Sequence, residues 1–194
     1  MNGTTNIVLC GVGGQGTVLA SKLIAAASMK KGKKVMSAET IGMAQKGGSV
    51  FSHLRIGDDI ETAAIKMGTA DIIIAFEPAE AVKMLPYLRE GGSVVVNSTA
   101  VMPVTAALKG SNYAGTEMIE YLKANVADLL IIDGNAEALK LGNPKVLNVI
   151  MLGAAVKSGQ LDLTRDDIMN AIKAKVKPQF IEINEKALNV AWNL

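Results

Sequence analysis

The sequence predicts an α/β protein with a doubly wound, Rossmann-like and mostly parallel sheet, helices on both faces and a C-terminal helical segment. Three observations predict it. Apolar runs alternate with helically spaced stretches from residue 6 to about residue 142. A glycine-rich turn joins the first such run to the first helical stretch. The composition is 49% hydrophobic but only 4% aromatic, which suits aliphatic strands covered by helices.

We expect a single domain over residues 1–194, with the sheet core at about 5–142 and the C-terminal helices at about 144–194. A chain of 194 residues is long enough to bury a full core. No stretch rich in Pro, Gly or Ser marks a linker, and the sequence has no internal repeat. The C-terminal helices are therefore expected to cover one face of the sheet.

The first elements follow from the spacing of apolar residues. The run 7–10 predicts a buried strand, and the helical spacing after it predicts a helix over 18–31 that ends at Gly32. The short apolar stretch 35–38 predicts a second strand. Alternation over 50–56 predicts a third, with Phe51, His53 and Arg55 on one side.

The middle of the chain continues the strand and helix rhythm. A less regular extended piece is expected near 62–66, and the continuous apolar run 71–76 indicates a strand buried on both faces. Pro78 suits the first turn of a helix over 79–88. A buried strand is then predicted at 93–97.

The last part of the chain is mostly helical. A helix over 117–123 leads to the strand 129–132, after which the strand pattern stops. Three helices are predicted from there, at 146–157, 168–176 and 180–192. Thr164 and Asp167 have the spacing of a capping box before the second of them.

A glycine motif at residues 11–17 follows the first predicted strand. Gly11, Gly13 and Gly16 match the G-x-G-x-x-G pattern in its strand–turn–helix context. Glycines there permit a tight turn and let phosphates approach the backbone, and the helix start attracts an anion. Alternatively, these glycines only pack the helix on the sheet. The candidate ligand-binding residues are Gly11, Gly13, Gly14, Gln15, Gly16 and Thr17.

A second glycine-rich segment follows the second predicted strand. Lys46 would supply an ammonium group and Gly47, Gly48 and Ser49 backbone amides, which together make a second anion-binding surface. We expect it close to the first glycine loop, because both follow early strands at the carboxyl edge of the sheet. The alternative is a surface hairpin with a solvated Lys46.

Three nearby side chains have competing interpretations. Glu39 follows the second strand, where a Rossmann fold places the acid that binds the ribose of a dinucleotide. A loop or interface role for Glu39 is the alternative. His53 and Arg55 are expected to be half-exposed strand residues that contact a neighbouring subunit.

Composition excludes several classes of function. The net charge of +2 gives no reason to expect nucleic acid or a charged membrane surface as a partner. One cysteine and one histidine cannot assemble a His/Cys metal site or a cysteine-ligated iron–sulfur cluster. Cys10 is expected to be a buried core residue. With no visible signal peptide or apolar run long enough to span a bilayer, we expect a cytoplasmic protein.

The two glycine elements together resemble the gamma-type subunit or domain of the 2-oxoacid:ferredoxin oxidoreductases. The resemblance rests on residues 11–17, 38–40 and 45–55, and continues through 70–71 and 76–78. The tail, at 148–153, 181–184 and 186–187, is most similar to the beta subunit of indolepyruvate ferredoxin oxidoreductase. The resemblance to the family covers essentially the whole chain.

This resemblance implies a function that the chain does not perform alone. The family decarboxylates a 2-oxoacid oxidatively with coenzyme A and passes electrons to ferredoxin, using thiamine diphosphate, magnesium and 4Fe-4S clusters. The sequence lacks both a Gly-Asp-Gly…Asn-Asn thiamine motif and a Cys-x-x-Cys. A large alpha partner subunit is therefore expected to carry those cofactors, while this chain contributes to coenzyme A binding.

The sequence alone leaves open one alternative function and one question about assembly. The alternative function is that of a stand-alone Rossmann-like oxidoreductase that binds NAD(P) or a flavin. The question about assembly is whether the chain forms a homodimer or binds the large subunit. In both cases we expect the contact to be made through residues 40–55.

Overall fold

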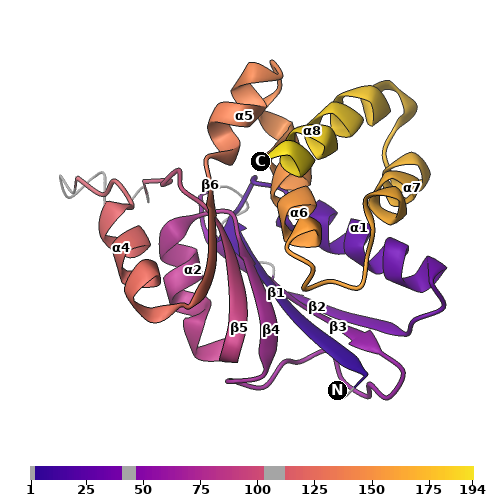
Figure 1. Ribbon diagram of the computed structural model, residues 1–194, viewed down its shortest axis with the longest axis horizontal. Coiled ribbons are helices and arrows are strands. Elements are labelled where there is room, and N and C mark those ends of the chain that lie inside the picture. Colours follow the sequence, from indigo (N-terminus) through magenta and orange to yellow (C-terminus); the bar gives the residue numbers. More distant parts are fainter. Residues whose placement is uncertain (1–2, 41–46, 103–111) are drawn as a thin grey trace.

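The fold is built on one six-stranded sheet with the strand order β2-β3-β1-β4-β5-β6. The computed structural model describes residues 3–40, 47–102 and 112–194 (Figure 1). Strand β3 is antiparallel to both of its neighbours, while β1, β4, β5 and β6 are parallel to one another. The strands are β1 (Thr4–Val12), β2 (Val35–Thr40), β3 (Ser49–Gly57), β4 (Ala70–Ala75), β5 (Leu88–Asn97) and β6 (Asp128–Ile132).

Local sequence accounts for several of the helix ends. Pro78 opens α2, where Glu77 caps the first turn by accepting from the N–H of Glu80. Thr164 and Asp167 form the predicted capping box of α7. The helices are α1 (Thr17–Lys30), α2 (Pro78–Met84), α4 (Thr116–Asn125), α5 (Gly134–Lys140), α6 (Leu147–Lys157), α7 (Arg165–Lys175) and α8 (Ile181–Asn193), with 3₁₀ turns η1 (Leu85–Tyr87), η2 (Pro144–Val146) and η3 (Pro178–Phe180).

Alternate side chains of the central strands enter two separate cores. On one face, Ile7 and Leu9 of β1 pack with residues of α1, α6, α7 and α8. On the other face, Val8 and Cys10 pack with residues of α2 and α4. The doubly wound prediction is thus confirmed, and the C-terminal helices share a core with β1 and α1 (Figure 1).

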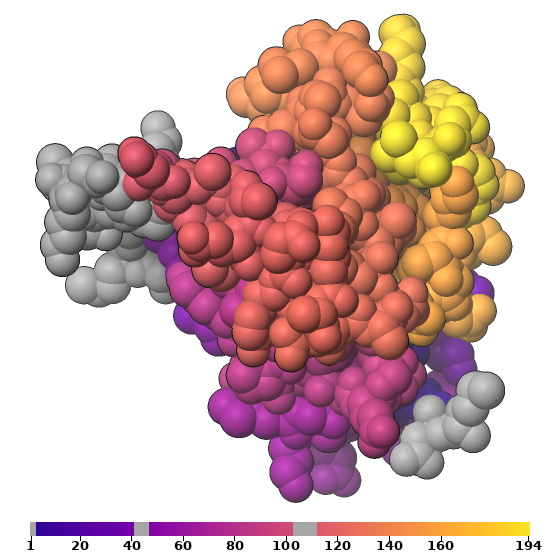
Figure 2. Space-filling view, turned by 60° about the vertical axis from the view of Figure 1, so that its left-hand side comes forward, coloured from indigo at the N-terminus to yellow at the C-terminus, as the bar shows by residue number. Residues whose placement is uncertain are grey.

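Helix α6 is the centre of the first face. Ten of its residues, from Leu147 to Val156, are buried. It packs against α8, with Gly153 so close that a Cβ there would lie 2.6 Å from the Cβ of Ala191. Figure 2 shows the yellow C-terminal helices beside the orange segment that contains α5 and α6. A helix that is apolar nearly all round, with Asn148 as the one polar residue between Leu147 and Val156, is expected to be covered on all sides.

The structure shortens the helix predicted over 79–88, because α2 ends at Met84, and it lengthens the strand predicted at 93–97, because β5 begins at Leu88. It also removes one predicted element and adds another. The extended piece expected near 62–66 is not a strand, because residues 58–69 only carry the chain from the end of β3 to the start of β4. Gly57 pairs with Thr4, so β3 ends at the edge where the parallel strands begin. Helix α5 was not predicted as a separate element.

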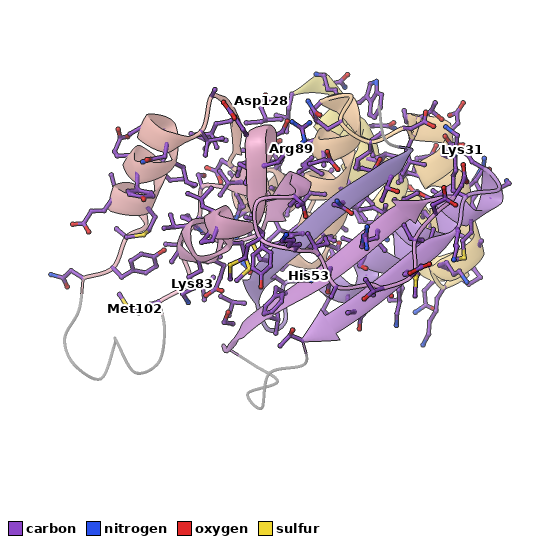
Figure 3. The ribbon with its side chains drawn as sticks, turned by 90° about the horizontal axis from the view of Figure 1, so that it is seen from below. Lys31, His53, Lys83, Arg89, Met102 and Asp128 are labelled. Carbon is purple, nitrogen blue, oxygen red and sulfur yellow. The ribbon has the colours of Figure 1, made fainter. Side chains whose placement is uncertain are left out.

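His53 is buried, which corrects the expectation of a half-exposed strand residue. The residue, labelled in Figure 3, is only 8% exposed. Its ring packs edge-on against that of Tyr87 of η1, with ring centroids 5.0 Å apart. Its Nδ1 accepts a hydrogen bond of 3.1 Å from the N–H of Ile65. That acceptor role requires a neutral ring, and burial lowers the pKa of His53 from its ordinary 6.5.

This burial predicts an acid-sensitive contribution to stability. Unfolded His53 takes up a proton near its ordinary pKa of about 6.5, whereas the folded chain does so only at lower pH. The free energy of unfolding should therefore fall as the pH drops below about 6.5, by at most ~1.4 kcal/mol for each unit by which the pKa is lowered. Above that pH, His53 is neutral in both states and contributes no slope.

The measurement is urea unfolding between about pH 5 and about pH 7.5, comparing the native chain with His53→Asn. Asparagine keeps an acceptor for the N–H of Ile65 but does not titrate. Because the chain contains one histidine, the difference between the two pH profiles isolates this group. Parallel profiles would show that His53 does not carry the effect.

In the part of the chain that the structure describes, no helix is both long enough and apolar enough to cross a membrane.

Candidate functional site

The two glycine-rich segments lie side by side at the carboxyl edge of the sheet. The register of β1 with β3 places Val12 opposite Ser49. Beyond that pair, the N–H of Gly13 donates to the carbonyl of Gly48 at 2.8 Å, and the N–H of Gly47 donates to the carbonyl of Gly13 at 3.4 Å. The expected proximity is therefore confirmed. It arises because β2 ends, and the antiparallel β3 begins, at the edge where β1 ends.

The first loop ends at an uncapped helix. Gly16 is the N-cap of α1 in a left-handed conformation (φ 86°), no side chain caps the helix, and its first turn holds no acidic residue. Within the described residues, the N–H groups of Gly16, Thr17 and Val18 have no acceptor. These free N–H groups and the positive end of the helix dipole favour an anion at this position.

Gly14 leaves the space in front of this helix start open. Its φ of 104° is a left-handed value that favours glycine, and a Cβ built there would have no atom within 4 Å. A ligand can thus approach the backbone of the loop directly.

Gln15 holds the loop in place through both ends of its side chain. Its Oε1 accepts from the N–H of Val12 at 2.7 Å, and its Nε2 donates to the carbonyl of Phe76 at 2.9 Å. Gly11 makes room for this arrangement, since a Cβ there would lie 2.8 Å from Gln15 Oε1 and 2.9 Å from Phe76 Cβ. Gln15 therefore positions the loop from inside the protein.

Asn97 is a site-supporting residue that the sequence analysis did not identify. It is fully buried at the end of β5 and donates to the same Phe76 carbonyl at 3.1 Å. Its Nδ2 also donates to Asn135 Oδ1, and its Oδ1 accepts from the N–H of Gly134, both at 3.0 Å. A polar residue that ends an otherwise apolar strand was the available indication.

A group of buried acids ties the second loop to α2. Glu77 and Glu80 are only 2% and 5% exposed. Ser49 donates a hydrogen bond to Glu80, which also accepts from Lys83 at 2.6 Å. Glu77 accepts from the hydroxyl of Tyr113 at 2.5 Å. Both carboxylates are thus paired within the protein, and Lys83 lies at the surface of this group (Figure 3).

These acids also affect two neighbouring groups. Burial, followed by the charges of Glu80 and Glu77, raises the pKa of the Cys10 thiol well above its ordinary value. Burial, followed by the hydrogen bond to Glu77 and the charges of Glu77 and Glu80, raises the pKa of Tyr113. Cys10 is therefore a protonated core residue, as expected, and not a nucleophile.

Glu39 lies away from the first glycine loop. Strand β3 separates β2 from β1, and Glu39 pairs opposite Ser52 of β3. Two strand spacings of ~4.8 Å put Glu39 roughly 10 Å from β1. A dinucleotide fold instead needs the acid-bearing strand directly beside the first strand.

The remaining predicted side chains have these outcomes. Arg55 donates through Nε to Asn6 Oδ1 at 2.9 Å and through Nη1 to the Thr62 carbonyl. Its guanidinium group therefore makes two hydrogen bonds within the chain. Lys46 lies outside the described residues. Among the described side chains, no group of three or more His, Cys, Asp or Glu residues could hold a metal ion.

Comparison with known proteins places this geometry in a family. Residues 6–194 match the family described as pyruvate ferredoxin/flavodoxin oxidoreductase. Indolepyruvate oxidoreductase subunit IorB from Pyrococcus horikoshii is 34% identical over 187 residues, which is 95% of this chain and 93% of IorB.

Solved structures share the fold. Pyruvate oxidoreductase subunit PORC from Thermotoga maritima gives a TM-score of 0.75 at 22% identity, covering 99% of this chain and 97% of that one. The 2-oxoglutarate:ferredoxin oxidoreductase from Magnetococcus marinus, solved with 2-oxoglutarate, coenzyme A and succinyl-CoA bound, gives 0.73 at 17% identity and covers 98% of this chain but 31% of that longer one. The resemblance found in the sequence is confirmed: the chain belongs to the pyruvate ferredoxin/flavodoxin oxidoreductase family, as a homologue of its IorB-type subunits.

Proposed function

We propose that this chain is the non-cluster subunit of a 2-oxoacid:ferredoxin oxidoreductase that acts on indolepyruvate. It supports the coenzyme A-dependent oxidative decarboxylation of the 2-oxoacid to an acyl-CoA, with electrons passed to ferredoxin. The observation that carries the proposal is the open, uncapped start of α1, joined by hydrogen bonds to a second glycine loop. The choice of substrate is supported by the 34% sequence identity with IorB, which extends over nearly the whole chain.

The redox chemistry is assigned to a partner. One cysteine, buried and protonated, and one histidine, buried in neutral form, leave this chain without the ligands for an iron–sulfur cluster. A large alpha subunit would hold thiamine diphosphate, magnesium and the 4Fe-4S clusters, and would pass electrons to ferredoxin. We place the assembly in the cytoplasm.

Coenzyme A is the proposed ligand of the two glycine loops. Its phosphate groups suit the free N–H groups at the start of α1, and the open space at Gly14 admits them. In this proposal, Lys46 adds a positive charge, while Gln15 and Ser49 hold the two loops in place. The site comprises Gly11, Gly13, Gly14, Gln15, Gly16 and Thr17 of the first loop and Lys46, Gly47, Gly48 and Ser49 of the second.

The free edge of β2 is the proposed contact with the large subunit. Four consecutive residues, from Ser37 to Thr40, are exposed, and β2 pairs with β3 on one side only. An exposed edge strand of this length offers unpaired backbone groups to another chain. It also adjoins the second glycine loop, so binding there would bring the partner close to the coenzyme A site.

The chain alone should be colourless and inactive. Because it cannot ligate an iron–sulfur cluster and lacks the thiamine motif, we expect no bound iron or sulfide and no 2-oxoacid-dependent dye reduction. Iron and sulfide analysis and the dye assay measure this, with the complex co-purified with the large subunit as the positive control. Turnover by the isolated chain would overturn the assignment.

Lys46→Ala tests the coenzyme A site. Loss of one charge-assisted hydrogen bond should raise the KM for coenzyme A about tenfold, or ~1.4 kcal/mol, and leave thermal unfolding unchanged. The matched control is Lys173→Ala, which removes an exposed lysine of α7 that is not part of the proposed site. Steady-state kinetics of the assembled enzyme give the answer. An unchanged KM in Lys46→Ala would remove Lys46 from the site.

Ala38→Lys tests the edge contact. Ala38 is exposed, so a lysine there should cost little folding stability but should oppose strand pairing with a partner. We expect loss of co-purification with the large subunit and an unchanged melting temperature. Asn193→Lys, at the exposed end of α8, is the control. Retained co-purification of Ala38→Lys would move the interface elsewhere.

A further inference from the structure

Asn148 is a buried amide whose donor atom faces the proposed anion site. It is the second residue of α6 and is only 4% exposed. Its Oδ1 accepts from the N–H of Val149 at 2.9 Å. Its Nδ2 has no acceptor among the residues that the structure describes. This amide donor is therefore available to an acceptor that arrives with a ligand.

The amide of Asn148 lies beside Gly16. A Cβ built on Gly16 would lie 2.6 Å from Asn148 Nδ2 and 3.1 Å from its Cβ. Gly16 is the N-cap of α1, and the free N–H groups of Gly16, Thr17 and Val18 start there. The side-chain donor of α6 and the backbone donors of α1 are therefore neighbours.

We propose that Asn148 Nδ2 donates a hydrogen bond to a phosphate oxygen bound at the start of α1. The inference rests on the proposed function, because it adds a binding residue from a distant part of the chain to the same anion site. A neutral amide suits this position, since it supplies a donor without requiring a counter-charge in a buried setting. The ligand is a phosphate ester or diphosphate, the chemistry shared by the two phosphate-bearing ends of coenzyme A.

Asn148→Asp separates binding from folding. Aspartate has nearly the same size and keeps an oxygen to accept from the N–H of Val149, and its charge suits the N-terminal end of α6. The melting temperature should therefore be unchanged or higher. The donor, however, becomes a negative acceptor that repels phosphate. Asn148→Ala removes the donor without adding charge and should weaken binding less.

Asn143→Asp is the matched control for the added charge. Asn143 lies shortly before α6, and its Oδ1 accepts from the N–H of Lys145 at 3.0 Å, an interaction that aspartate retains. The experiment measures, on the complex assembled with the large subunit, the Kd of inorganic pyrophosphate by calorimetry, the KM for coenzyme A and for dephospho-coenzyme A, and the melting temperature.

We expect Asn148→Asp to raise the pyrophosphate Kd and the coenzyme A KM about tenfold or more, while Asn143→Asp matches the native complex. An equal loss with dephospho-coenzyme A assigns the contact to the diphosphate, and a loss confined to coenzyme A assigns it to the 3′-phosphate. If the native complex binds pyrophosphate and coenzyme A, and the Asn148→Asp and Asn148→Ala complexes bind them as tightly as the native one does, the role of Asn148 is overturned and the proposed function stands. If the native complex binds neither pyrophosphate nor coenzyme A, both fall.

Discussion

The arrangement of the carboxyl edge of the sheet depends on the hydrogen bonds that the carbonyl oxygen of Phe76 accepts. This oxygen lies just beyond β4 and accepts from Gln15 of the first glycine loop and from Asn97 at the end of β5. Asn97 continues the connection to the start of α5. One carbonyl thereby fixes the positions of three strand ends and of the loop that precedes α1. Such a buried, fully paired polar network is rigid, because breaking any of its hydrogen bonds would leave a buried group unpaired.

This rigidity explains how a loop of glycines keeps a defined shape. Gly14 and Gly16 both adopt left-handed backbone angles, which cost glycine much conformational entropy on folding. Gln15 holds the chain from within through its two hydrogen bonds, and Asn148 of α6 lies against Gly16. The free N–H groups of α1 are consequently presented in one arrangement before any ligand arrives, which lowers the cost of binding.

The insertion of β3 between β1 and β2 distinguishes this fold from a dinucleotide-binding one. It moves Glu39 one strand further from the glycine loop and puts a second glycine-rich segment in its place. An acid beside the loop would favour a ribose, whereas the backbone amides of the second segment favour further phosphate. The stand-alone NAD(P) or flavin enzyme is therefore not favoured, which agrees with the membership of the chain in a family of multi-subunit oxidoreductases.

The sequence by itself determined the strands, most of the helices, the buried Cys10 and the two glycine loops, because apolar periodicity and glycine patterns are local properties. Only the tertiary structure decided the direction of β3, the burial of His53, and the positions of Asn97 and Asn148. Asn97 lies 82 residues from Gln15, and Asn148 lies 132 residues from Gly16. No local pattern specifies which distant side chain meets a loop. The position of Asn97 depends on the order of the strands, and that of Asn148 depends on how α6 packs against the sheet and α1. Both are therefore fixed only when the whole core forms.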